Sequence, residues 1–443
     1  MKKIKIVLPA SFLVLATLVH TNSIANGYEF LHQSAEGLGS AYATNGTAIN
    51  DISAMFSNPA SIIRFDGIRA SGNFTLDLPR SEMDSASATG PYSSGAVIVE
   101  GSPSKPKQFI DTAFGAAGYM TYEYEEDLIV GFAINAPFAY VSDYVDTAVT
   151  RYTATKTGLQ AINFSPTFAY RVNQKWAIGG SLNIQDYEAT LGTQVATSVD
   201  DPNVNTDISS LIEGSDIGYG FSIGFEFQQS DRTRYGASFR SKIDHHFKGT
   251  VKLSGTDANL ASGSTSLPSL TNYNGVAKFD ISTPFMLQFG LLHKLNETYE
   301  LYANANLSGW SAFKDTHITY DNGLPETVVD NDWSDSWYFA VGMGYQYSEK
   351  VKLRTGMAYD WTPTPSAAVS PRAPNNDRYN IGLGASYQYS PATKIDFGYQ
   401  YIKFTEVTIA LAGGNNVPRG TLNGKINLYA NVFMLQMNHQ FNL

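Results

Sequence analysis

A single short motif in this chain could perform covalent chemistry. Gly220-Phe221-Ser222-Ile223-Gly224 matches the GxSxG pattern of serine hydrolases, in which a strained strand-to-helix turn exposes the serine as the nucleophile of acyl transfer. Here Ser222 falls inside a stretch where small and large apolar residues alternate, and such alternation predicts a strand and not a turn. We therefore interpret the motif as a chance match.

Metal and cofactor chemistry have equally little support. The chain has 7 histidines and no cysteine, which rules out thiolate metal sites, cysteine nucleophiles and disulfides. His245 and His246 are adjacent, so on a strand they point to opposite faces and cannot readily share one ion. We predict no cofactor, no metal and no enzyme; a lipase built from a serine and a histidine is the enzymatic alternative.

Residues 1–25 have the pattern of a signal peptide. Three lysines precede an apolar run from Ile6 to Val19, and Ser23-Ile24-Ala25 supplies the small residues of a cleavage site. The run is shorter than the ~18 residues of a spanning helix, so a retained anchor is disfavoured. Removal of the three lysines changes the formal charge from −10 to −13, and an acidic chain is unsuited to nucleic acid.

The rest of the chain predicts strands. No later segment resembles a spanning helix, and the mean hydropathy of −0.18 excludes a helical membrane protein. From Gly67 onward, large apolar residues alternate with small or polar ones, as in Ile217–Gln228, Trp337–Ser348 and Tyr379–Tyr389. Aromatic residues gather at the strand ends, which is typical of a transmembrane barrel at its two lipid interfaces and not of a soluble sandwich.

The connections between these strands alternate between short and long. Six short turns are predicted at Tyr124–Asp127, Asn173–Lys175, Ser230–Thr233, Asn296–Thr298, Ser348–Lys350 and Ser390–Thr393. Seven long polar segments lie near Ser81–Lys107, Tyr140–Thr155, Glu188–Gly214, Ser254–Gly275, Ser311–Asp332, Thr362–Asp377 and Thr405–Asn423. Thirteen connections join 14 strands, so residues 67–443 are predicted to form an all-β fold, a 14-stranded antiparallel transmembrane β-barrel of the bacterial outer membrane.

The last strand must pair with the first to close the barrel, because an open edge in lipid leaves backbone groups unsatisfied. We expect Gly424–Leu443 to pair with Gly67–Leu78. The apolar residues of the last strand change parity near Asn431. Either a bulge shifts the register there, or the lumen is locally apolar.

Asn26–Asp66 differs from the strands and is predicted to be a hatch, or plug, inside the lumen. It is rich in small residues and lacks strict alternation. Asn58 can cap a helix while Pro59 occupies the first helical position, so a short helix through Ile63 is expected. Because both termini lie at the short-turn end, the hatch enters the barrel from that side.

The mature chain resembles the FadL family of outer-membrane transporters of long-chain fatty acids and other hydrophobic compounds. The N-terminal resemblance is carried by Gly27-Tyr28-Glu29-Phe30, Glu36–Tyr42 and Asn58-Pro59-Ala60. Further signatures are similar to Tyr235–Lys242, Ser308–Phe313, Leu353–Asp360, Pro371–Pro374 and Asp377-Arg378-Tyr379. The resemblance extends over essentially all of the mature chain.

The resemblance implies sites along the route of the substrate. A shift near Phe30 or near Asn58, Pro59 and Ala60 of the hatch would open the lumen. The family's third strand is kinked and opens the wall sideways, and Asn135-Ala136-Pro137-Phe138 lies in the matching region; the alternative is that Pro137 only ends the strand. An external apolar groove would be formed by Tyr140, Val141, Tyr144 and Val145, which otherwise serve to pack the loops.

A carboxylate in a dry lumen requires a cationic partner. The family has been thought to use basic residues on the strand that corresponds to Trp176–Leu191, and this chain has none there. Arg151, Lys156 and Lys314 are the candidate substitutes, each alternatively a solvated or interface charge. This departure keeps neutral hydrophobic substrates open.

The sequence thus predicts passive uptake of long-chain fatty acids or related hydrophobic molecules: capture in the groove, passage through a plugged lumen and exit through a wall gap. The expected partners are these small molecules, outer-membrane lipid, lipopolysaccharide and the barrel-assembly machinery, with no nucleic acid and a monomeric barrel. The alternatives are an aromatic-hydrocarbon transporter of the same fold, or a structural outer-membrane porin or adhesin.

Overall fold

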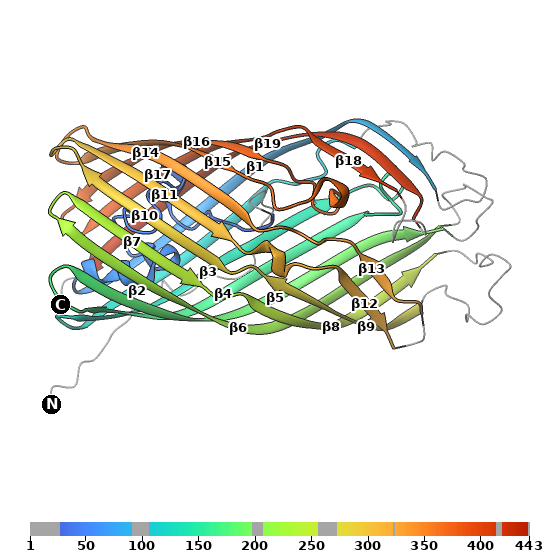
Figure 1. Ribbon diagram of the computed structural model, residues 1–443, viewed down its shortest axis with the longest axis horizontal. Coiled ribbons are helices and arrows are strands. Elements are labelled where there is room, and N and C mark those ends of the chain that lie inside the picture. The colour runs from blue at the N-terminus through green and yellow to red at the C-terminus, as the bar shows by residue number, and fades with distance from the viewer. Residues whose placement is uncertain are drawn as a thin grey trace.

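The computed structural model describes residues 27–90, 106–196, 207–255, 273–321, 324–412 and 419–441. These residues form one antiparallel sheet that closes into a long barrel, with the N-terminal segment inside the end that carries the short turns (Figure 1). None of the helices in these ranges is long and apolar enough to cross a membrane. The expected signal peptide, residues 1–25, lies outside the described ranges and stays a prediction.

The described residues contain nineteen strand segments, and all but β12 and β13 belong to the 14 strands of the barrel. β7 and β8, β9 and β10, and β17 and β18 each continue one strand across a short break, and Pro284, which lacks an N–H, lies in the second break. β12 and β13 form a small hairpin on the loop between β11 and β14, and β12 pairs with β9. The segments are β1 Ile68–Thr89, β2 Ala113–Glu125, β3 Leu128–Asp143, β4 Lys156–Arg171, β5 Trp176–Val195, β6 Ile208–Ser230, β7 Thr233–Arg240, β8 Ile243–Ser254, β9 Tyr273–Thr283, β10 Met286–Lys294, β11 Tyr299–Ser308, β12 Thr316–Tyr320, β13 Thr327–Val329, β14 Ser336–Gln346, β15 Val351–Asp360, β16 Arg378–Ser390, β17 Thr393–Phe404, β18 Val407–Leu411 and β19 Thr421–Phe441.

The predicted strand count and closure are confirmed. β1 pairs with β19 from Ile68↔Phe441 to Thr89↔Thr421, which closes the barrel. All six predicted short turns join consecutive strands. The predicted long loops included too many residues, because β1, β5 and β6 continue well into the segments expected as loops. With 20 to 23 residues, these strands far exceed the roughly 10 residues that cross a bilayer.

Beyond the membrane, the apolar face of the long strands points into the barrel, whereas within the membrane it points outward. We call the end of the barrel with the short turns the lower end and the end with the long loops the upper end. In the lower half of β6, Tyr219, Phe221 and Phe225 point outward and are exposed, as expected for lipid contact. In the upper half of the same strand, Ile212 is buried inside while Glu213 points outward and pairs with Lys252 of β8 at 2.8 Å. The barrel therefore continues past the membrane as a wall that is polar outside and apolar inside.

β19 resolves the alternatives left open for the last strand. Its inward and outward residues alternate continuously from Leu422 to Met437, and no register shift interrupts its pairing near Asn431. Ile426, Leu428 and Val432 all point inward and are fully buried. The lumen is locally apolar at this height, and the interpretation as a bulge was wrong.

The segment before β1 lies inside the barrel. It contains α1 (Ala35–Gly39), α2 (Ala54–Ser57) and the 3₁₀ helix η2 (Pro59–Arg64). α1 packs against β15, β16, β17 and β19, whereas η2 packs against β3 to β6, so the segment spans the lumen. Residues 27–66 are the described part of the predicted hatch, and we refer to them as the hatch. The division of the chain at residue 66 into two domains stays a prediction.

Glycines on the lumenal face let the hatch backbone approach the wall. A Cβ at Gly356 would overlap the carbonyl of Ser40, and one at Gly224 would overlap the side chain of Asn58. Gly39 meets Gly384 backbone to backbone, with a hypothetical Gly39 Cβ only 2.6 Å from the Gly384 Cα. The small-residue face of the predicted strands is thus the contact surface of the hatch.

We expect Gly224→Val to loosen the hatch while the barrel still forms, because the new side chain takes the place of Asn58. The purified variant in a planar bilayer should conduct ions more steadily than the wild type. Gly118→Val is the control, since a Cβ at Gly118 meets nothing within 4 Å. Equal conductance of both variants would contradict this account of the glycine face.

Candidate functional site: a wall seam completed by the hatch

The pairing between β2 and β3 ends partway up the barrel. The last paired residues are Gly118 and Ile134, although β3 continues to Asp143. On its other side β3 stays paired with β4 but shifts register between Asn135 and Phe138, which is a β-bulge. The upper part of β3 thus has an edge that β2 does not cover, and we call this place the seam.

The hatch bonds to this edge of β3. Phe30 donates its N–H to the Pro137 carbonyl at 2.7 Å, and Ala139 donates to the Tyr28 carbonyl at 3.1 Å. The Gln33 side chain donates to the Ala136 carbonyl at 2.7 Å. These bonds satisfy groups that β2 leaves unpaired, so residues 28–30 act as a short additional strand.

Phe30 connects the two sides of the seam. Its backbone is bonded to β3, whereas its ring lies 3.5 Å from the Cβ position of Gly115 on β2. On the outer surface of the two strands, Phe114 and Phe132 are 61% and 43% exposed, as expected of lipid-facing side chains. The hatch therefore covers the seam from the inside, at a height where the outside faces lipid.

An aromatic cluster lies above the seam. Tyr28 packs edge-on against Trp310 and Phe313, with ring centroids 4.8 and 5.3 Å apart, and contacts Trp333 at 5.4 Å. Phe138 contacts both Tyr28 and Trp310. All five rings are buried, so the first residues of the hatch lie within the apolar outer lumen.

Asn58 fixes the other end of the hatch. Its Oδ1 accepts from the Ala60 N–H at 3.0 Å, as expected of a helix cap, and η2 begins at Pro59. Its Nδ2 donates to the carbonyls of Gly46 at 2.7 Å and Phe225 at 3.0 Å. The predicted helix start is confirmed, and its cap also joins the hatch to β6.

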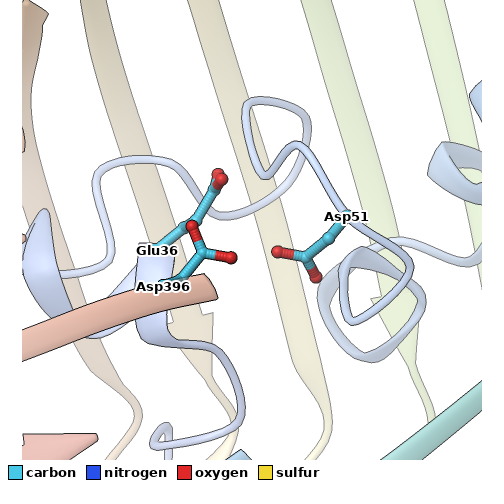
Figure 2. Close-up of side chains that lie close together, drawn as sticks. All are labelled: Glu36, Asp51 and Asp396. Carbon is cyan, nitrogen blue, oxygen red and sulfur yellow. The ribbon is translucent and has the colours of Figure 1, made fainter. Parts of the chain in front are cut away.

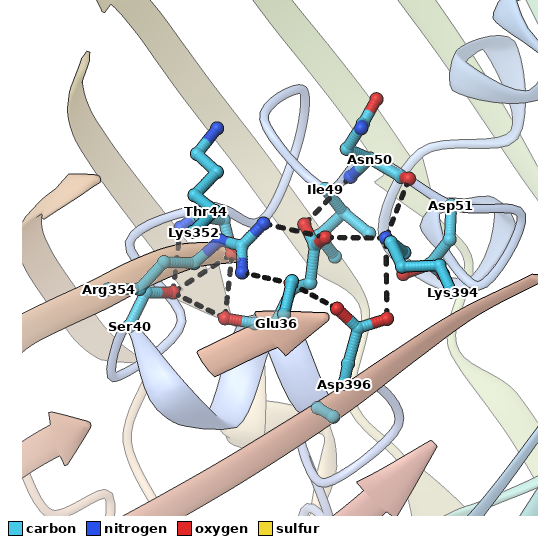
Figure 3. A network of polar contacts seen from close by, with 12 residues as sticks. Glu36, Ser40, Thr44, Ile49, Asn50, Asp51, Lys352, Arg354, Lys394 and Asp396 are labelled. Carbon is cyan, nitrogen blue, oxygen red and sulfur yellow. Dashed lines mark hydrogen bonds and ion pairs between the residues drawn. The ribbon is translucent and has the colours of Figure 1, made fainter. Parts of the chain in front are cut away.

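Three carboxylates meet between the hatch and β17. Glu36, Asp51 and Asp396 have oxygens within 4.8 Å of one another (Figure 2). The Lys394 ammonium contacts all of them, at 2.7 Å from Glu36, 3.5 Å from Asp51 and 3.3 Å from Asp396 (Figure 3). A lysine thus already supplies the positive charge that a metal ion would bring.

Glu36 is the centre of this network. Arg354 of β15 donates to its Oε1 at 2.7 Å, and the Asn50 N–H donates to its Oε2 at 2.9 Å. Burial alone would raise the pKa of Glu36, but the cations Arg354 and Lys394 hold that pKa well below its usual value. The ion pairs therefore stay charged across the physiological pH range and anchor α1 to the wall.

The four predicted groove residues do not share one surface. Tyr140 and Tyr144 are buried, and Tyr144 stacks on Phe109 at 4.7 Å and donates its hydroxyl to the Pro371 carbonyl. Val141 is half-buried on the opposite face, and Val145 is 68% exposed. The two tyrosines line the interior, and the predicted groove remains untested.

Each predicted carboxylate partner already has an acidic partner. Arg151 is buried and pairs with Asp207 at 3.1 Å. Lys156 pairs with Asp143 at 3.6 Å, and Lys314 pairs with Asp332 at 3.0 Å, with both lysines exposed. A role for any of the three in substrate binding stays a prediction.

The candidate chemical residues lie as the sequence suggested. Ser222 is within β6, and its hydroxyl accepts from the Asn183 side chain at 2.9 Å. His245 is buried and bonded to Asp216 and Gln185, while His246 is on the outer face beside Asp280. The histidines therefore point to opposite faces, as predicted.

Sequence reasoning missed the charged residues that join the wall to the hatch. Glu226 of β6 pairs with Arg64 of the hatch at 3.3 Å and with Arg234 of β7 at 3.6 Å, whereas the pair of Arg378 with Asp360 lies within the wall and faces the lumen. Arg240 of β7 donates to the Phe56 carbonyl at 2.6 Å. The available signal was a charged residue on the small-residue face of a strand, where a solvated charge is not expected.

Comparisons with known proteins agree with this architecture. The family model described as "Outer membrane protein transport protein (OMPP1/FadL/TodX)" matches residues 16–441. A long-chain fatty acid transport protein of Escherichia coli O6:H1 is 24% identical over 419 residues, which cover 89% of this chain and 91% of that protein. The crystal structure of a Pseudomonas aeruginosa FadL homologue has a TM-score of 0.83 at 21% identity and covers 94% of this chain and 100% of its own. The toluene transporter TodX of P. putida has a TM-score of 0.65 at 16% identity, covering 91% and 99%.

We expect Glu36→Gln to weaken the docking of α1, because it leaves Arg354 and Lys394 with fewer carboxylates in a buried site. Loss of one partner from a buried ion pair costs about 3–5 kcal/mol. Hydrogen exchange should show lower protection of residues 35–45. Lys252→Gln is the control, since it removes the pair of Lys252 with Glu213 within the wall, and equal losses in both variants would contradict the anchoring role.

The docking of the hatch tip should weaken as the pH rises. Burial raises the pKa of Glu29 to about 7, opposed by the Ser308 hydrogen bond; Asp360 raises it further, and Arg240 and Arg378 lower it. Because its pKa is raised in the docked state, the protonated Glu29 contributes its full stabilisation of docking below about pH 4.5. This contribution, at most about 3 kcal/mol, is lost as the pH rises through 7. Exchange protection of the Phe30 N–H, corrected for its intrinsic rate, should fall in this range. In Glu29→Gln it should stay constant; a fall of the same size there would contradict the assignment.

Proposed function

The chain belongs to the outer membrane transport protein family (OMPP1/FadL/TodX), and on this premise we propose that it takes up long-chain fatty acids or related hydrophobic molecules by passive transport. Its place in the bacterial outer membrane follows from the family and from the closed barrel. The similar protein of E. coli is named for the transport of long-chain fatty acids, and TodX for that of toluene.

One observation carries the proposal: an apolar interior leads to a wall seam that the hatch completes. Above the membrane the inner faces of β6, β8 and β19 present Ile212, Val251 and Leu428, all buried. Below the seam the lumenal face presents polar residues such as Asn163, Ser165, Asn183 and Gln288. A hydrophobic molecule is therefore favoured in the outer lumen and disfavoured farther down.

The polarity of the lumen gives a direction to the exit. Transfer of apolar surface out of water gains about 25 cal/mol per Å², and this gain would be lost among the polar side chains of the lower lumen. Sideways release at residues 135–138 takes the molecule directly into lipid. In this proposal the bonds of Tyr28 and Phe30 to β3 break during release, while Asn58, Pro59 and Ala60 keep the hatch in place.

The proposal includes no covalent chemistry, and Ser222 serves as a wall residue. Tyr140, Val141, Tyr144 and Val145 assist capture at the outer end. The barrel acts as a monomer, reaches the membrane through the barrel-assembly machinery and is surrounded at its outer rim by lipopolysaccharide.

A second candidate substrate class is aromatic hydrocarbon. The cluster of Tyr28, Phe138, Trp310, Phe313 and Trp333 offers ring edges and faces to a flat, uncharged molecule. A general porin is disfavoured, because the hatch spans the lumen and bonds to β1, β6, β15 and β19.

A reversible cross-link tests the seam. Glu29 and Phe138 form an isolated antiparallel bridge, a geometry in which facing Cβ atoms lie about 4.5–5.5 Å apart. The chain has no cysteine, so the double variant Glu29→Cys, Phe138→Cys places the only two thiols of the protein opposite each other at this bridge. We expect oxidation to abolish the uptake of radiolabelled oleate by cells and reduction to restore it.

The two single-cysteine variants are the controls for loss of the native side chains. Both should transport at a rate that does not respond to oxidant. Normal uptake by the fully oxidised pair would refute release at the seam. Absence of uptake by the wild type itself would refute the transport of fatty acids altogether.

A further inference from the structure

We propose that Arg240 binds the carboxylate of the transported molecule, which makes the substrate a long-chain acid and not a neutral hydrocarbon. This inference rests on the proposed function and names the substrate class of its lumenal site. Arg240 is the last residue of β7 and points into the lumen, where its guanidinium lies 4.2 Å from the centre of the Phe56 ring.

Arg240 is half-buried and forms no ion pair within 4 Å in the described ranges, although Glu29 attracts it over a longer distance. Its Nη2 donates to the Phe56 carbonyl, while its Nη1 is buried and has no hydrogen-bond partner in the described ranges. The other wall cations that bond to the hatch are paired among these residues: Arg171 with Asp127, Arg234 with Glu226, Arg354 and Lys394 with Glu36. Arg240 thus retains the capacity to bind an anion.

The surroundings of Arg240 suit a small anionic group. It lines a small cavity of about 20 Å³ whose wall combines apolar side chains such as Leu31, Phe239 and Met286 with the polar residues Ser222, Ser238, Gln288 and Asn306. Hydroxyl and amide groups can donate to carboxylate oxygens, as a guanidinium does with two parallel N–H groups. A cavity of this size has room for about one water molecule, which a carboxylate bound to Arg240 would displace.

The cavity also lies on the proposed route of the substrate, between the apolar outer lumen and the seam. Glu29 lines it, while the residue before Glu29, Tyr28, belongs to the aromatic cluster of the outer lumen. A second cavity of about 10 Å³ shares Arg240 and Ser222 and extends to Asn135 at the seam. An acid held by Arg240 would have its chain in the apolar outer lumen and its head beside the exit.

Glu29 does not oppose the binding of an anion. Its Oε2 accepts from Ser308 at 2.9 Å, and its Oε1 has no hydrogen-bond partner in the ranges described. Because burial raises the pKa of Glu29 to about 7, a large share of this carboxyl is protonated at neutral pH and can donate. A neutral hydrocarbon in the same place would leave Arg240 desolvated and unpaired, which is costly.

The test measures the binding of palmitate and of hexadecanol to the purified full-length barrel in nanodiscs, by equilibrium dialysis with radiolabelled ligands. We expect the wild type to prefer the acid by about tenfold or more, the range for a charge-assisted hydrogen bond. Arg240→Gln should reduce the preference to about one while its affinity for the alcohol stays the same. Arg240→Lys, which keeps the charge, should retain part of the preference.

Arg234→Gln is the matched control. Arg234 lies on the same strand and face and also bonds to the hatch, through the Thr47 carbonyl at 2.8 Å, but has Glu226 as its partner. It should keep the full preference for the acid. Retention of the preference in Arg240→Gln would overturn the inference, as would equal binding of both ligands by the wild type. If the wild type binds neither ligand, the proposed function itself fails.

Discussion

Strand edges in a membrane have no water to satisfy their N–H and C=O groups, and this constraint determines most of the structure. It requires β1 to pair with β19 throughout the membrane, and their pairing in fact continues beyond it over more than 20 residues. It also makes the upper edge of β3 costly, because β2 stops pairing at Ile134. The hatch removes this cost by placing its own backbone against Pro137 and Ala139. A plug and a wall component are therefore one and the same segment.

The hatch can take this position because the lumenal face leaves room for its backbone. Glycines such as Gly356 and Gly384 allow contacts that any Cβ would prevent. Where side chains separate the hatch from the wall, ion pairs join the two: Glu36 of the hatch and Glu226 of the wall each contact two cations. In the lower barrel the interface thus combines these ion pairs with apolar packing of Ile62, Ile63 and Phe65 against the wall, whereas above the seam aromatic packing dominates, around Tyr28.

The sequence was sufficient for the strand count, the closure and the start of η2, because these depend on local signals: period-two alternation, short turns and the Asn58 cap. The strand lengths were not predictable with the same rule. Ile426 and Leu428 were ambiguous since apolar residues were expected to face lipid, whereas above the membrane they face inward. The ion pairs between the hatch and the wall could not be predicted from the sequence either. Glu36 and Arg354 are 318 residues apart, and only the register of β15 brings them together.

The energies of these contacts decide which part of the hatch can move. The tip is held to β3 by a few neutral hydrogen bonds, each worth about 1 kcal/mol. α1 is held by buried ion pairs whose disruption costs about 3–5 kcal/mol. Aromatic contacts of Tyr28 add to the hold on the tip, yet a hydrophobic ligand that entered between Trp310 and Trp333 would compete for the same surfaces. In the proposed function, occupancy of the outer lumen would therefore loosen the tip and leave α1 anchored, so that the seam would open without displacement of the whole plug.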